Sequence, residues 1–204
     1  MSVAGLVLAG GRGSRLGADK AMAELGGLSL AQRSAGRLRP QVAALAISAN
    51  GDPRRFGPGS PPVLADVVPG FRGPLAGILS GLIWATAQGP CRWMATVAVD
   101  TPFFPADLVA RLLAAAAPHP ELIAVARSRG RLHPVFALWP LGCLPALDAA
   151  LRREDGGKVM AFIDGQGYVP VDFDDEASGI DPFFNINTPE DLAEARKLLN
   201  RPAP

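Results

Sequence analysis

The sequence predicts an α/β fold: a three-layer, Rossmann-like arrangement with a mostly parallel central sheet, helices on both faces and a small antiparallel addition. Short apolar segments alternate with helical patterns along most of the chain, which is the order that parallel sheets require. A glycine-rich loop follows the first apolar segment, and polar residues follow several later ones. In open parallel sheets this edge binds the ligand.

Composition and charge predict one domain over residues 1–200, with a short tail at 201–204. The chain has 204 residues, 49% of them hydrophobic, and no break in composition that would mark a linker. Its net charge of +1 argues against a nucleic-acid surface, which needs a basic excess. Cys91 and Cys143 lack the spacing of a zinc site or a disulfide framework. The N-terminal apolar run is shorter than the ~20 residues of a membrane span, so we expect a cytoplasmic protein with no membrane association.

The first apolar segment is predicted to be a buried strand that opens onto a phosphate-sized loop at 10–17. Glycines in this loop allow backbone N–H groups to approach a polyphosphate, and Arg12, Arg15 and Lys20 add positive charge. A Walker A loop needs its lysine directly after the last glycine, but two residues intervene here. A dinucleotide-binding loop would need glycine where Leu16 stands. A long anion loop that ends in a lysine remains.

The next elements place two polar residues at the same edge. Ser29 is predicted to cap a helix that runs to about Arg39, and residues 42–48 form the second strand. Asn50 follows that strand and is placed to contact a base or a ribose, although an Asn-Gly turn without a ligand fits the spacing nearly as well. Residues 63–65 form a short strand that ends at Asp66, for which a solvated carboxylate is the default interpretation.

The middle of the chain supplies a candidate metal ligand. Gly73 precedes a helix predicted from Pro74 to about residue 88, whose amino end carries partial positive charge. Residues 93–99 are an uninterrupted apolar strand, which we expect to be the most central. This strand ends at Asp100, and a carboxylate facing a triphosphate loop suits Mg²⁺, whose other ligands are phosphates and waters. The alternative is a helix-capping aspartate.

The C-terminal part predicts further helices and strands and more polar candidates. We expect a helix that begins near 105–107, a strand at 122–126, a basic turn at 127–131 and a strand at 132–138. A helix at 142–153, a turn into a short second helix at 156–162, a strand at 168–173 and a helix that begins after Thr188 follow. The strands within 131–173 are expected to form the antiparallel addition. Lys158 lies at a predicted helix start, where a cation suits only an anionic ligand. Asn185 and Asn187 alternate, so both are expected to face one side.

The loop resembles the signature of the molybdenum cofactor guanylyltransferases. The matching residues are Leu8-Ala9-Gly10-Gly11, Arg15-Leu16-Gly17 and Asp19-Lys20, with Leu16 for the usual methionine and one residue, Ala18, where some members have two. Asp66 and the motif at 73–77, the pair His133-Pro134 and the segment 185–190 also resemble the family. The resemblance extends from residue 3 to about 199.

The resemblance implies a nucleotidyltransferase that moves GMP from GTP to the phosphate of molybdopterin with Mg²⁺ and releases pyrophosphate. It implies GTP contacts by Leu8, Ala9, Gly10, Gly11, Arg12, Lys20, Asn50, Asp66, Gly73 and Asp100. Catalytic roles fall to Lys20, Arg15 and Asp100, the last as the metal ligand. Contacts on the pterin side fall to Arg131, His133, Lys158, Asn185 and Asn187, with a solvated arginine-rich hairpin as the alternative for the first two. Molybdoenzyme maturation proteins are left open as partners.

Two other functions stay open at this point. A cytidylyltransferase or a sugar-phosphate nucleotidyltransferase would use the same loop, although the Gly10-Gly11 pair favours guanylyl transfer, because cytidylyl members of the family tend to have alanine before the second glycine. A non-catalytic adaptor that binds GTP and pterin is a different class. An adaptor would not need both Lys20 and Asp100.

Overall fold

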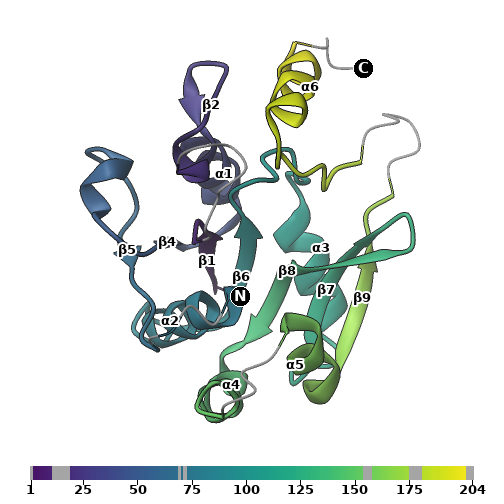
Figure 1. Cartoon of the computed structure of the whole chain (residues 1–204). Helices are drawn as coiled ribbons and strands as arrows, with labels where there is room; N and C mark the ends of the chain where they lie inside the picture. The colour runs from purple at the N-terminus through teal and green to yellow at the C-terminus, as the bar shows by residue number, and fades with distance from the viewer. Residues whose placement is uncertain are drawn as a thin grey trace.

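The computed structural model describes residues 2–10, 19–68, 70, 73–153, 158–174 and 181–200. A seven-stranded sheet in the order β5-β4-β1-β6-β8-β7-β9 forms its centre (Figure 1). Its strands are β1 (Ser2–Leu8), β4 (Ala44–Ser48), β5 (Val63–Leu64), β6 (Cys91–Ala98), β7 (Ile123–Ser128), β8 (Arg131–Pro140) and β9 (Tyr168–Asp172). The α-helices are α1 (Leu30–Leu38), α2 (Pro74–Thr86), α3 (Leu108–Ala116), α4 (Leu144–Leu151), α5 (Val159–Gln166) and α6 (Pro189–Leu199).

Strand direction confirms the mostly parallel sheet and limits the antiparallel part to β8. β1 pairs in parallel with β4 and β6, β4 pairs in parallel with β5, and β7 pairs in parallel with β9. β8 pairs antiparallel with both β6 and β7. The expectation that β9 would also be antiparallel is wrong: β8 ends at the edge where β7 begins, and α4 and α5 keep the chain at that edge until β9 starts. As expected, β6 is the central strand of the order.

Helices on the two faces of the sheet bury two separate hydrophobic clusters. One cluster joins α1 and α3 with side chains from the C-terminal part of the chain: Phe183 and Ile186 before α6, and Ala195 within α6. The other joins the sheet to α2, α4 and α5, which lie together in the lower part of Figure 1. The predicted three-layer arrangement is therefore confirmed.

The helix starts predicted at Ser29 and Thr188 are both capping boxes. Ser29 Oγ accepts from the backbone N–H of Gln32 at 3.1 Å, and the Gln32 side chain accepts from Ser29 N at 2.9 Å. Thr188 and Asp191 exchange the same pair of bonds at 3.2 and 2.9 Å. These bonds satisfy N–H groups that have no partner within the first turn.

Helix α2 lies unusually close to the sheet, because glycines face it. A Cβ atom on Gly81 would stand 2.4 Å from Leu6 Cδ2 and 2.8 Å from Met94 Sδ. A Cβ atom on Gly77 would stand 2.3 Å from Ser48 Oγ. This close approach holds the amino-terminal turns of α2 against Ser48, at the carboxyl end of β4.

Two local features differ from the sequence-based expectations. A small hairpin of β2 (Glu24–Leu25) and β3 (Leu28–Ser29) precedes α1, and Gly26 and Gly27 form its turn with positive φ angles of 56° and 76°. A Gly-Gly pair between two short runs is a hairpin signal. The turn expected at 127–131 is shorter, because Arg127 and Arg131 belong to β7 and β8.

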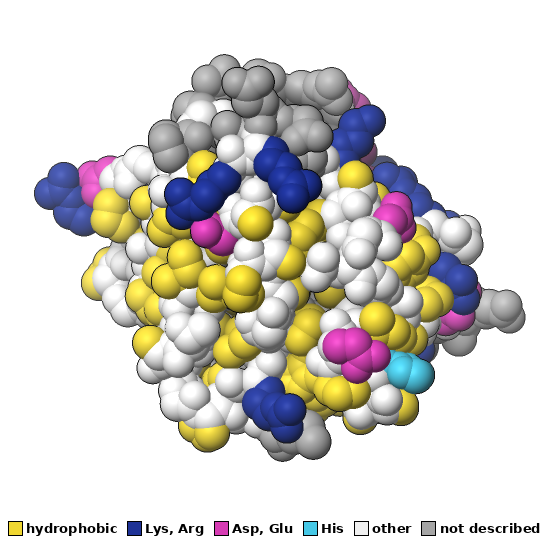
Figure 2. Space-filling model, turned by 90° about the horizontal axis from the view of Figure 1, so that it is seen from below, with side chains coloured by type: hydrophobic (Ala, Val, Ile, Leu, Met, Phe, Trp, Pro, Cys, Tyr) yellow, Lys and Arg dark blue, Asp and Glu magenta, His cyan; other side chains and the backbone are white. Residues whose placement is uncertain are grey.

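The face seen from below shows where apolar side chains remain accessible. In Figure 2 they gather across the middle of this face, and Lys and Arg side chains lie mainly toward its rim. Among the described residues, none of the helices is long and apolar enough to cross a membrane.

Candidate active site

Candidate residues that follow four neighbouring strands lie at the carboxyl edge of the sheet. β1 leads to Ala9 and Gly10, β4 to Asn50, β5 to Asp66 and β6 to Asp100. The predicted edge therefore collects most of the described candidates, because parallel strands end on the same side.

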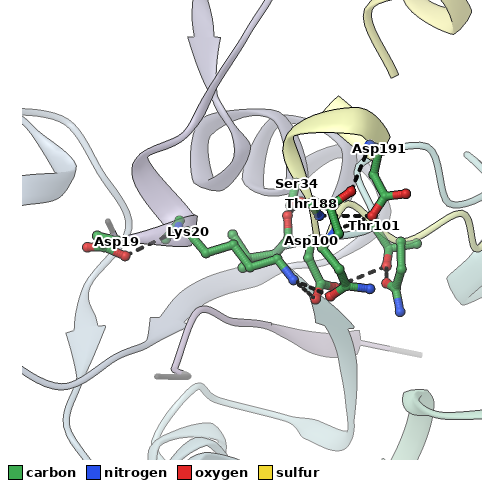
Figure 3. Close-up of polar contacts among 11 residues, drawn as sticks. Asp19, Lys20, Ser34, Asp100, Thr101, Thr188 and Asp191 are labelled. Carbon is green, nitrogen blue, oxygen red and sulfur yellow. Dashed lines mark hydrogen bonds and ion pairs between the residues drawn. The ribbon is translucent and has the colours of Figure 1, made fainter. Parts of the chain in front are cut away.

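Lys20 and Asp100 form the centre of this group. Lys20 begins η1 (Lys20–Met22), and its Nζ donates to Asp100 Oδ2 and to Asn187 Oδ1, both at 2.7 Å. Figure 3 shows the lysine side chain pointing toward Asp100, with Thr188 and Asp191 beside it at the start of α6. The side chains of Lys20 and Asp100 are 18% and 23% exposed, so both can meet a ligand.

A second set of contacts holds Asp100 from behind. Thr101 is buried, and its Oγ1 contacts Asp100 Oδ1 at 3.2 Å and Asn185 Oδ1. The backbone N–H of Ile186 donates to the Asp100 carbonyl at 2.8 Å. The segment 181–188 thus crosses the end of the central strand and brings Asn187 to Lys20 and Asn185 to Thr101. Thr101 was missed, although its place directly after a strand-end aspartate was a signal.

Asn50 and Asp66 form a reciprocal pair one strand further out. Asn50 Nδ2 donates to Asp66 Oδ2 at 2.7 Å, and the Asp66 N–H donates to Asn50 Oδ1 at 3.0 Å. The N–H of Val67 donates to Ser80 Oγ of α2 at 3.0 Å. These bonds fix the Asp66 carboxylate and tie the next residue, Val67, to the middle of α2.

The start of η1 is held by a cation that sequence reasoning did not single out. Arg55 Nε lies 3.0 Å from Asp19 Oδ2, and Asp19 Oδ1 accepts from the N–H of Ala21 at 3.2 Å. The Arg55 guanidinium also lies over the Phe56 ring, 4.8 Å from its centroid. Nothing in the local sequence distinguishes Arg55 from the exposed Arg54.

His133 lies near the start of β8, in the hairpin that β7 and β8 form. Its Nε2 lies 2.8 Å from Ser128 Oγ, and its ring stacks on Phe183 with centroids 4.3 Å apart. Burial lowers the pKa of His133, against a smaller opposing effect of the Asp181 charge. The imidazole is therefore neutral at neutral pH.

Arg131 and Lys158 are both exposed. Arg131 begins β8, and Lys158 is the N-cap residue of α5. Within the described residues neither side chain makes a hydrogen bond or ion pair with Lys20 or Asp100. Their predicted pterin contacts stay predictions.

Comparison with known proteins identifies the family. Residues 5–167 match the family model described as a MobA-like NTP transferase domain. The chain belongs to this family. Proteins named molybdenum cofactor guanylyltransferase are similar to it over nearly their whole length: one from Mesorhizobium japonicum is 54% identical, covering 97% of this chain and 96% of the relative, and one from Rhodopseudomonas palustris strain HaA2 is 48% identical, covering 96% and 92%.

Solved structures agree on the fold of this MobA-like transferase. Molybdopterin-guanine dinucleotide biosynthesis protein A from Archaeoglobus fulgidus superposes with a TM-score of 0.73 at 20% identity, covering 96% of this chain and 98% of that one. The 2-C-methyl-D-erythritol 4-phosphate cytidylyltransferase from Thermus thermophilus reaches 0.65 at 21% identity, covering 97% and 98%. The predicted fold and the predicted family are both confirmed.

Part of the anion loop of this MobA-like chain lies outside the described residues. This applies to Gly11, Arg12 and Arg15, whose predicted roles stay predictions. Leu8, Ala9 and Gly10 lead into the loop at the end of β1, and Gly73 precedes the first turn of α2 with a φ of 67°. A Cβ atom on Gly10 would meet no described atom within 4 Å.

The donor set around Asp100 fits a cation shared with a substrate. The described residues hold no cluster of three or more His, Cys, Asp or Glu side chains that would bind a metal alone. Mg²⁺ commonly takes only one or two protein carboxylates and completes its octahedron with phosphates and waters. Asp100, partly exposed at the ligand edge, meets that requirement.

A groove elsewhere on this MobA-like chain is not the candidate site. It lies at the opposite edge of the sheet, where β6 begins and β8 ends, and is lined by Cys91–Trp93, Pro120–Glu121, Pro140–Cys143 and Gln166. Burial raises the pKa of Cys143 to about 12, so its thiol stays protonated. The groove therefore offers no reactive thiolate at Cys143.

Proposed function

We propose that this protein transfers GMP from GTP to the phosphate of molybdopterin, releases pyrophosphate and forms the guanine dinucleotide form of the molybdenum cofactor. The names of the similar proteins support this reaction. The observation that carries it is the contact of Lys20 Nζ with Asp100 Oδ2 at 2.7 Å. It brings the lysine that ends the anion loop to the carboxylate that ends the central strand.

The chemistry needs charge compensation more than a base. A phosphate oxygen of the acceptor attacks the α-phosphorus of GTP, and the bond from that phosphorus to the bridging oxygen of pyrophosphate breaks. Because the attacking oxygen is already an anion, no proton has to be removed. The protein therefore acts by holding the two anionic substrates in line and by neutralising charge on the α-phosphate.

Lys20 is proposed as the residue that neutralises this charge. In the described structure its ammonium group already has two oxygen partners, Asp100 and Asn187. We propose that α-phosphate oxygens of GTP take the place of the Asp100 contact, since a mobile lysine head group can move between nearby anions. Asn187 would continue to orient the ammonium group.

Asp100 is proposed to hold Mg²⁺ together with the GTP phosphates. The bound cation would supply a Lewis acid for the phosphoryl oxygens. Thr101 contacts Asp100 Oδ1 and Lys20 contacts Oδ2, so the carboxylate is already oriented. Release of Oδ2 by Lys20 frees an oxygen at the ligand edge.

Asn50 and Asp66 are proposed to bind the nucleoside, and Gly73 is proposed to let the phosphates approach α2. The reciprocal hydrogen bonds between Asn50 and Asp66 hold these two side chains in one arrangement before GTP arrives. Preorganised polar groups lower the ordering cost of binding. The amino end of α2 adds N–H groups and partial positive charge.

The residues that contact the pterin, the partner proteins and the cellular location of the enzyme are also proposed here. Asn185 and Asn187 stand at the centre of the site, so they can meet the acceptor phosphate as it reaches the α-phosphate. Arg131 and Lys158 remain candidates for anionic groups further out. We expect a cytoplasmic enzyme that hands its product to molybdoenzyme maturation proteins.

A nucleotide comparison tests the proposed function. Pyrophosphate release is measured with Mg²⁺ and GTP, CTP, ATP or UTP, each with and without molybdopterin, for the wild type and Asp100→Asn. We expect release with GTP that depends on molybdopterin and is lost in the variant. Release with CTP instead would favour the cytidylyl alternative. Binding of GTP without any release would support the adaptor.

A further inference from the structure

We infer that Ser128, His133 and Asp181 form a hydrogen-bonded relay that positions the segment 181–188 over Asp100. This makes His133 a positioning residue for guanylyl transfer rather than a contact of the pterin. The inference rests on the proposed function, and it gives a use to three polar side chains that the proposed chemistry leaves unassigned.

The direction of the relay follows from its donors and acceptors. Ser128 Oγ lies 2.8 Å from His133 Nε2 and 3.1 Å from Asp181 Oδ1. An ionised carboxylate accepts only, so the single hydroxyl proton of Ser128 points to Asp181. His133 must then donate its Nε2–H to Ser128 Oγ. Both ends of the serine are satisfied only with this tautomer of the neutral imidazole.

The relay ends on the first turn of the segment. Asp181 Oδ1 also accepts from the N–H of Phe183 at 2.9 Å, and the Asp181 carbonyl accepts from Phe184 N at 3.0 Å. The Phe183 ring stacks on His133 and packs edge-on against Phe173, with centroids 5.7 Å apart. His133 thus holds this turn in two ways: through Ser128 it holds Asp181, and through ring stacking it holds Phe183.

The segment carries the two amides of the site between two fixed ends. The relay holds residues 181–183, and Asp191 holds the other end by accepting from Asn187 N at 2.8 Å. Asn185, between these points, contacts Thr101, and the side chain of Asn187, at the second point, contacts Lys20. A shift of about 1 Å in such a segment can lower a rate about 100-fold when it misplaces groups at the reacting atoms.

Burial separates this role from a direct substrate contact. Ser128 is 1% exposed, so a substrate cannot reach its hydroxyl group. If His133 served only as a pterin contact, the loss of the Ser128 hydroxyl would leave turnover unchanged. If His133 acts through the relay, Ser128→Ala and His133→Phe affect the same step.

The test is a double-mutant cycle with a rescue. Pyrophosphate release from GTP with molybdopterin is measured at saturation for Ser128→Ala, His133→Phe and the double variant. His133→Gln can place an amide donor near the position of Nε2 and is the rescue variant. Thr96→Val is the matched control, because it removes a buried hydroxyl whose partners, Val135 O and Trp139 Nε1, do not belong to the relay.

We expect each single variant to lower kcat about tenfold or more, with the affinity for GTP changed less than twofold. The double variant should be no slower than the slower single variant, since both break one relay. His133→Gln should recover most of the rate, and Thr96→Val should lower the melting temperature while keeping kcat. Normal kcat in Ser128→Ala, or a defect of His133→Phe confined to the KM for the pterin, would overturn the relay.

A second readout keeps the relay testable if the proposed reaction fails. Amide hydrogen exchange of residues 183–187 is compared between the wild type, Ser128→Ala and Thr96→Val without substrates. Faster exchange confined to this segment in Ser128→Ala supports the relay whatever the enzyme transfers. Unchanged exchange contradicts it, and absence of pyrophosphate release from the wild type contradicts only the proposed function.

Discussion

Lys20 makes the contacts on which the proposed chemistry depends. Its ammonium group joins a carboxylate from the central strand and an amide from the C-terminal segment, both at 2.7 Å. The first partner is the proposed metal ligand, and the second lies on the segment held by the His133 relay. The ammonium group of Lys20, at the end of the anion loop, therefore contacts both the central strand and the C-terminal segment.

Replacing Lys20 tests this role at the level of one residue. Lys20→Ala is expected to lower kcat about 100- to 1,000-fold, as for the loss of one preorganised donor to developing charge. Lys20→Arg keeps the charge but not the compact head group that fits between Asp100 and Asn187, so we expect it to recover only part of the rate. Steady-state pyrophosphate release measures both. Wild-type kcat in Lys20→Ala would contradict the assignment, and Lys197→Ala, at an exposed pair with Glu194, is the control.

The lowered pKa of His133 predicts a pH-dependent stability. Burial depresses this pKa in the folded state, and Arg131 lowers it further while Asp181 opposes both. Below the ordinary histidine pKa of about 6.5, the unfolded chain binds a proton that the folded chain does not, so stability falls as the pH falls. We expect the free energy of unfolding of the wild type to lose more between pH 7 and 5 than that of His133→Gln. Urea titrations at each pH measure the difference, and parallel curves would contradict the prediction.

At the scale of elements, the glycine face of α2 sets where the nucleotide side of the site lies. Gly77 and Gly81 allow the helix to rest on β1, β4 and β6 without a side chain between them. The amino-terminal turns of α2 are thereby held against Ser48, at the carboxyl end of β4. This is an arrangement in which packing in the core positions a functional edge.

Gly81→Ala tests the packing of α2. The added methyl group would meet Leu6 and Met94 within a filled core, so we expect a loss of about 1–3 kcal/mol in the free energy of unfolding. Gly36→Ala is the matched control, since Gly36 is an exposed position inside α1 with nothing within 4 Å of its added Cβ. That variant should gain about 0.5–1 kcal/mol from helix propensity. Chemical denaturation measures the free energy of unfolding of both variants. An equal change in the two would contradict the close packing of α2 on the sheet.

For the whole molecule, much of the site was predictable because strand ends and helix caps are local patterns. The sequence alone placed Asp100 after the central strand, Asn50 and Asp66 at the same edge, and Thr188 at the start of α6. The contacts of Thr101 with Asn185, of Arg55 with Asp19 and of Ser128 with Asp181 were not predictable, because these partners lie far away in the chain. The distances from Asp100 to Lys20 and from Ser128 to Asp181 depend on how the sheet orders its strands, which no local pattern encodes.

The same long-range order explains how the C-terminal segment completes the site. The match to the family model ends at residue 167, whereas Asn185 and Asn187 come later in the chain. They reach Lys20 and Thr101 because β9 returns beside β7 and α6 then packs near β2. In Figure 1 the purple strand β2 and the yellow helix α6 accordingly both lie at the upper end of the molecule.

The most direct test follows the α-phosphate of GTP. GTP labelled at that phosphorus is incubated with molybdopterin, Mg²⁺ and the wild type, Lys20→Ala or Asp100→Asn, and the labelled products are separated and weighed by mass spectrometry. The account predicts that the wild type places the label in a product with the mass of molybdopterin plus GMP, less water, and that both variants lose this product. Label that stays in GTP, or appears only in free GMP, would contradict it.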